Sequence, residues 1–86
     1  RMDRVEADLT EKLQEALDHY KQALELDPKH AEAHCNLGVL LEEQGQLKQA
    51  RLHFQRALDL GKAEHRPRNQ DNLARVEAAL RVSERP

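Results

Sequence analysis

Three residues near the middle of the chain have side chains that could bind a metal. His30 and His34 stand four residues apart, which places two imidazoles on one face of a helix, and Cys35 follows directly. Zinc accepts such ligands, but a structural zinc site needs four of them. Cys35 lies about 100° around the helix from His34, and no further ligand cluster accompanies the three residues. We interpret His34 as a packing residue and expect neither a metal nor a cofactor.

The residues that could act as nucleophiles also lack the neighbouring groups that catalysis requires. The chain has one serine (Ser83), one threonine (Thr10) and one cysteine (Cys35). A nucleophile needs a base within hydrogen-bond reach and a group that stabilises the developing oxyanion. Cys35 lacks the electropositive neighbours that lower the pKa of a thiol. The three glycines are isolated and form no phosphate-binding loop. The sequence therefore predicts a protein that is not an enzyme.

The composition of the chain argues against several further classes of protein. The 86 residues are 38% apolar and 35% charged, with a net charge of −2. A single cysteine excludes an internal disulfide and favours a reducing, intracellular and cytoplasmic setting. No apolar run is long enough to span a membrane, and no signal peptide opens the chain. The arginines of residues 62–86 alternate with acidic residues and have no aromatic neighbours, so nucleic-acid binding is not expected. The first residue is Arg1, which suggests a segment of a larger protein.

Apolar residues recur at helical spacing along the whole chain. The pattern predicts helices over residues 1–27, 29–44, 47–60 and 68–82. Pro28, Gly45 and Gly61 mark the ends of the first three helices. Residues 62–67 form a polar loop, after which Asn69 is a candidate N-cap. No strand pattern is present, so the fold class is all-α.

A stretch of sequence is repeated after 34 residues. Ala16, Tyr20, Ala23, Leu24 and Leu26 reappear as Ala50, Phe54, Ala57, Leu58 and Leu60. A fixed period of this length is typical of stacked helical hairpins.

These residues resemble a tetratricopeptide repeat (TPR). The resemblance implies that Gly38 and Ala50 lie where two helices cross, with Phe54 beside them. This agrees with packing, because small residues permit two helices to approach closely and a large one fills the remaining space. Residues 31–64 read as one full unit and residues 13–26 as the second helix of a preceding one. The resemblance implies a single domain over residues 1–86, with antiparallel hairpins of a TPR-like superhelix, a long N-terminal helix (1–27) and a capping helix (68–82). The sequence departs from the family in three places. His34 stands where a large residue is common, Lys62 replaces the proline equivalent to Pro28, and two extra residues precede the last helix.

The start of the chain differs most from the pattern of the family. The helix that should pair with residues 13–26 would occupy residues 1–10, but Asp3 and Arg4 fall where a tight apolar crossing is required. The segment is either a degenerate hairpin or one long helix, and we favour the long helix. Val5, Leu9 and Leu13 would then lack an intrachain partner. A homodimer, or an upstream repeat, would cover them.

The resemblance also implies a function in protein–protein interaction, with a concave groove that holds a peptide or helix of a partner. The positions carried over to this groove are Glu32, Cys35, Asn36, Val39, Glu42, Glu43, Asn72 and Arg75. The amides of Asn36 and Asn72 could each donate to and accept from a partner's backbone, although either could instead tie its own helix to the next. The acidic residues of this set would repel an acidic chaperone tail. The alternative function is structural self-association without a peptide ligand.

Overall fold

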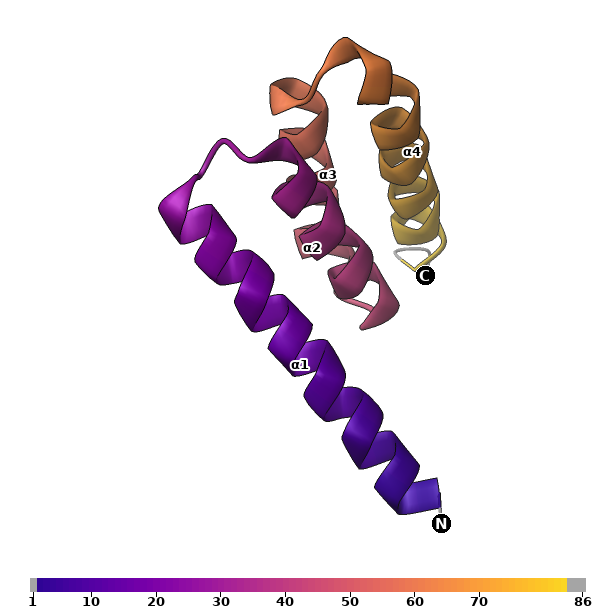
Figure 1. Ribbon diagram of the computed structural model, residues 1–86. Coiled ribbons are helices and arrows are strands. Elements are labelled where there is room, and N and C mark those ends of the chain that lie inside the picture. Colours follow the sequence, from indigo (N-terminus) through magenta and orange to yellow (C-terminus); the bar gives the residue numbers. More distant parts are fainter. Residues whose placement is uncertain (1, 84–86) are drawn as a thin grey trace.

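The computed structural model describes residues 2–83, with side chains from residue 11 onward. It contains α1 (Met2–Leu26), α2 (Ala31–Glu43), α3 (Leu47–Leu60) and α4 (Arg66–Ser83), with a short 3-10 turn at Ala63–His65. Successive helices run in opposite directions, and no strand occurs between residues 2 and 83 (Figure 1). The predicted all-α, TPR-like fold class is confirmed.

The first helix is continuous. α1 has 25 residues, which at about 1.5 Å per residue is close to 40 Å. It therefore takes the long-helix form rather than that of a degenerate hairpin. Its C-terminal half lies along α2, and its N-terminal half extends past the other helices (Figure 1). Asp27 and Pro28 end it because proline cannot continue the backbone hydrogen-bond ladder.

A hairpin of α2 and α3 forms the centre of the molecule. Gly45 turns the chain between them with a φ of 80°, a conformation that glycine adopts without steric cost. A Cβ atom on Gly38 would lie 2.8 Å from both Cδ1 and Cε1 of Phe54, and Phe54 is fully buried. The missing side chain of Gly38 is thus the space that the Phe54 ring occupies. Ala50 is fully buried as well, so the expected close crossing of the two helices is present.

The last helix packs on α3 and begins earlier than the sequence suggested. α4 starts at Arg66, so Asn69 lies inside the helix and the prediction that it is the N-cap is wrong. Asn69 is 1% exposed, and its Nδ2 donates to the backbone oxygen of Ala57 at 3.2 Å. Pro67 fits the first turn of this helix, where the missing N–H is not needed. Asn69 therefore ties the start of α4 to the last turn of α3.

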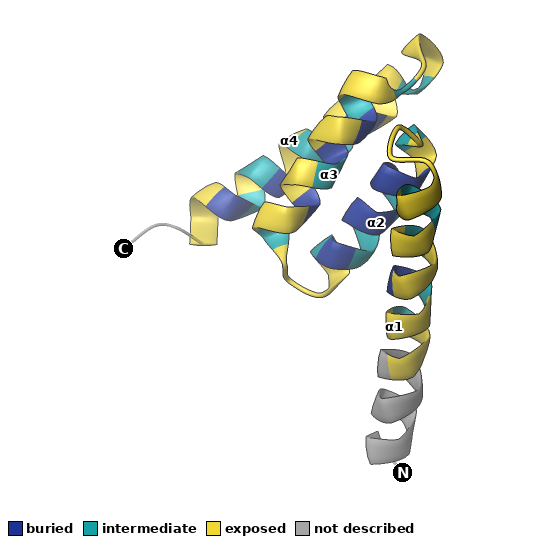
Figure 2. Cartoon of the chain, turned by 90° about the vertical axis from the view of Figure 1, so that its left-hand side faces the viewer, coloured by how far each residue is buried: buried dark blue, intermediate teal, exposed yellow. Residues whose placement is uncertain are grey.

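The repeated residues are buried to different extents in the two copies. On α3 the side chains of Ala50, Phe54 and Ala57 are fully buried, because this helix lies between α2 and α4. Their counterparts on α1, which packs against α2, are only half-buried: Ala16, Tyr20 and Ala23. Figure 2 shows buried positions concentrated on the facing sides of α2, α3 and α4. The core is thus centred on the α2–α3 hairpin, and Leu17 is the buried contribution of residues 11–26 of α1.

Candidate partner-binding face

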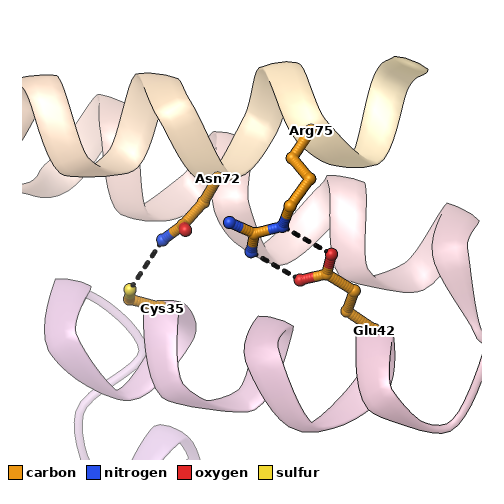
Figure 3. A network of polar contacts seen from close by, with 4 residues as sticks. All are labelled: Cys35, Glu42, Asn72 and Arg75. Carbon is orange, nitrogen blue, oxygen red and sulfur yellow. Dashed lines mark hydrogen bonds and ion pairs between the residues drawn. The ribbon is translucent and has the colours of Figure 1, made fainter. Parts of the chain in front are cut away.

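Two residues predicted to line the groove form an ion pair between α2 and α4. The Arg75 guanidinium donates from Nε to Glu42 Oε2 at 2.7 Å and from its Nη2 to Glu42 Oε1 at 2.6 Å (Figure 3). This two-bond geometry fixes the relative position of the planar groups. The hydrogen bond to Glu42 raises the pKa of Arg75, which stays charged at every physiological pH. The pair therefore joins the exposed sides of α2 and α4.

A second contact joins the same two helices closer to their N-terminal ends. Asn72 on α4 donates from Nδ2 to Cys35 Sγ at 3.6 Å, as Figure 3 shows. Cys35 is only 5% exposed and belongs to the core, so the prediction that it lies on the groove surface is wrong. The α4 helix covers its sulfur. Asn72 uses one of its amide hydrogens for this contact, which fits the interpretation that it ties α4 to α2.

The other predicted groove residues remain accessible on α2. Asn36 and Val39 are half-buried, whereas Glu32 and Glu43, near the two ends of the helix, are exposed. We define the α2/α4 face as Asn36, Val39, Glu42, Asn72 and Arg75. It combines one apolar side chain, two amides and one internally balanced ion pair. Such a surface can offer hydrogen bonds and a small apolar contact, but it presents no unpaired cation to an acidic ligand.

The residues predicted to mediate self-association are only partly described. Leu13 is half-buried on α1. Val5 and Leu9 belong to the stretch of α1 whose side chains lie outside the described residues. Leu13 is the counterpart of Leu47, which is also half-buried. The α1 side chains that are less buried than their counterparts on α3 are Ala16, Tyr20 and Ala23.

A histidine pair is the main polar feature that the sequence did not reveal. His34 Nδ1 lies 3.0 Å from His53 Nδ1, and His34 Nε2 lies 2.9 Å from the backbone oxygen of Pro28. The two rings are stacked, with centroids 5.3 Å apart and an interplanar angle of 28°. His34 is 8% exposed. The only available signal was the presence of His34 at a position where the family commonly has a large residue.

The described part of the chain contains neither a cluster of metal ligands nor a helix that could span a membrane. Within it, no group of three or more His, Cys, Asp and Glu side chains is arranged to hold a metal ion. His30 instead caps α2, its Nδ1 accepting from the Ala33 backbone N–H at 3.0 Å. None of the described helices combines the length and the apolar character that crossing a bilayer requires.

The repeated hairpin, the glycine–phenylalanine crossing and the α2/α4 face together define a helical repeat protein. A family model described as "TPR repeat" matches residues 10–45, and one described as "Tetratricopeptide repeat" matches residues 31–61. The two matches together identify residues 10–61 as tetratricopeptide repeat sequence. Repeats of this family generally mediate protein–protein interaction or scaffolding, and they are typically not catalytic.

One curated relative resembles more than half of the chain. It is the "Probable biofilm formation methyltransferase WspC" of Pseudomonas putida (strain KT2440), 45% identical over 53 residues. The match spans 62% of this chain but only 12% of the relative. The similarity is thus to a small part of a much longer protein.

Proposed function

We propose that the α2/α4 face binds a peptide or helix of a partner protein, and that the chain acts by presenting this rigid surface rather than by catalysis. The observation that carries the proposal is the two-bond Arg75–Glu42 pair, which holds α2 and α4 side by side with one shared outer face. The half-buried amide of Asn36 lies on that face, on α2. Preorganised surfaces bind more tightly because less motion is lost on association.

The charge of the face indicates the chemistry of its ligand. Glu32 and Glu43 are exposed, and the positive charge of Arg75 is already matched by Glu42. A ligand of neutral or weakly basic character meets no repulsion here, whereas an acidic peptide does. We therefore expect an uncharged or mildly basic segment whose backbone is hydrogen-bonded by Asn36.

A random peptide library selected on the immobilised protein tests this function. For a selected peptide, Asn36→Ala should weaken binding by about two- to twelvefold, as expected for the loss of one hydrogen bond worth about 0.5–1.5 kcal/mol. Fluorescence polarisation with the labelled peptide measures the change in Kd.

The matched control is Gln49→Ala, which removes an exposed amide from α3. It should leave the Kd unchanged. If every selected peptide binds Asn36→Ala and Glu42→Arg as well as it binds the original protein, the α2/α4 face is not the binding surface.

A second candidate function is self-association through α1, and one observation favours it. The half-buried Ala16, Tyr20 and Ala23 have fully buried counterparts on α3. The difference matches the absence, on α1, of the second neighbouring helix that α3 has. A helix supplied by another copy would complete the burial of this stripe.

Sedimentation equilibrium tests the second candidate. If α1 mediates self-association, the protein should sediment as a dimer, and Leu13→Asp should shift it to the monomer by placing a charge in the apolar contact. Lys12→Asp introduces the same residue at the adjacent exposed position and should leave the dimer intact. A monomer at all concentrations would reject self-association and leave the peptide-binding proposal standing.

A further inference from the structure

The hydrogen bonds of His34 and His53 dictate where their protons lie. The backbone oxygen of Pro28 can only accept, so the Nε2 of His34, 2.9 Å away, must carry a hydrogen. Neutral His34 then has an unprotonated Nδ1. That atom accepts from the Nδ1–H of His53 across the 3.0 Å separation. One arrangement of protons therefore satisfies both contacts.

The contact between the rings survives an additional proton on His53 Nε2 but not one on His34 Nδ1. A proton on His53 Nε2 leaves the contact between the rings in place, because Nδ1 of that ring remains a donor. A proton on His34 Nδ1 would set two N–H groups against each other at 3.0 Å, so the contact between the rings would have to break.

The groups that act on His53 oppose its charged form. Lys21 of α1 and Arg56 of α3 are the cations near its ring, and Leu24, Leu52 and Pro28 line the same pocket. None of these residues supplies a carboxylate. Burial, reinforced by His34, Arg56 and Lys21, lowers the pKa of His53 below its ordinary value.

We propose that the His34–His53 pair is an acid-sensitive joint, which links α2 to α3 while the pair is neutral and loses the contact between its rings on acidification. The two contacts link three segments: the turn through Pro28, α2 through His34 and α3 through His53. The contact to Pro28 remains on acidification because His34 Nε2 keeps its hydrogen, so the turn stays bound to α2 and the link to α3 is the one that is lost. Histidine is suited to this role because its charge changes near neutral pH.

The direction of the pH effect follows from the proton balance. The unfolded chain binds a proton on His53 near the ordinary pKa of histidine, whereas burial in the folded protein lowers the pKa of that ring. Stability contributed by the pair is therefore complete above about pH 6.5 and declines as the pH falls below that value. Each extra proton bound by the unfolded chain changes the unfolding constant by at most about tenfold per pH unit.

Urea unfolding at pH 7.5 and pH 5.5 measures this decline. The unfolding constant of the original protein should rise by about three- to tenfold more than that of His53→Gln. The glutamine amide can still donate to His34 but has no charge to gain. His19→Gln is the matched control, since His19 is exposed and occupies the same position one repeat earlier. It should keep the pH response of the original protein.

Two further measurements on the unmodified protein keep the proposal testable if His53→Gln folds poorly. Nitrogen-15 NMR at pH 7.5 should show the His34 ring protonated at Nε2 and not at Nδ1. Hydrogen-exchange protection factors over residues 31–37 of α2 and 50–56 of α3 should fall at pH 5.5 more than those within α4. The proposal is overturned by a hydrogen on His34 Nδ1 at pH 7.5, by uniform loss of protection, or by equal pH responses of the original protein and His53→Gln.

Discussion

Phe54→Ala should lower the free energy of unfolding by about 3–5 kcal/mol, the range found when a buried phenylalanine is truncated. Phe54 is fully buried and occupies the space beside Gly38, so its removal leaves a cavity between α2 and α3. A domain of this size has little stability in reserve, since small chains bury a smaller fraction of their surface. Urea unfolding followed by circular dichroism should therefore show a much lower midpoint or a protein that is already partly unfolded.

The internal repeat supplies a matched control for this prediction. Tyr20 occupies the same position one repeat earlier but is only half-buried. Tyr20→Ala should therefore cost clearly less stability than Phe54→Ala, since less surface returns to water and no closed cavity forms. Equal losses at the two positions would contradict the view that α3, rather than α1, is the centre of the core.

Gly38→Val should also destabilise the protein, by about 1–3 kcal/mol through overpacking. The first atom of the new side chain would lie 2.8 Å from the Phe54 ring, which no side chain tolerates without movement of its neighbour. Valine is intrinsically a better helix residue than glycine by a few tenths of a kcal/mol. The steric cost is larger than this gain in helix propensity, so the net effect is a loss of stability.

A double mutant separates this steric cause from a general effect on the helix. Phe54→Leu removes the ring atoms that the new side chain would meet. The combination Gly38→Val with Phe54→Leu should therefore cost less than the sum of the two single changes, by an amount measurable in a double-mutant cycle. Strict additivity in urea unfolding would show that the two positions do not share the crossing.

The sequence predicted the helices and the central crossing because both depend on local or periodic signals. Prolines, glycines and the spacing of apolar residues fixed α1, α2 and α3 to within two residues of their observed ends. The start of α4 was less well predicted. A 3-10 turn carries the chain into Arg66, two residues before the expected start, and Asn69 becomes a buried tie to Ala57 instead of a cap.

The sequence predicted which helices carry the candidate site, but not which of its side chains contact one another. The resemblance to the tetratricopeptide repeat placed Glu42 on α2 and Arg75 on α4, on faces that meet. It did not indicate that their charges would neutralise each other, nor that α4 would cover Cys35. Such contacts depend on how far each helix is rotated about its own axis, which is set by packing between residues distant in sequence.

The sequence by itself determined an all-helical repeat with a small-to-large crossing at Gly38 and Phe54, because helix formation and repeat spacing are written in neighbouring residues. Only the tertiary structure decided that His34 meets His53 and that α1 is half-covered while α3 is fully enclosed. Those outcomes follow from which helices lie on either side of a given helix. Burial and long-range hydrogen bonds arise from that arrangement, and no local pattern specifies them.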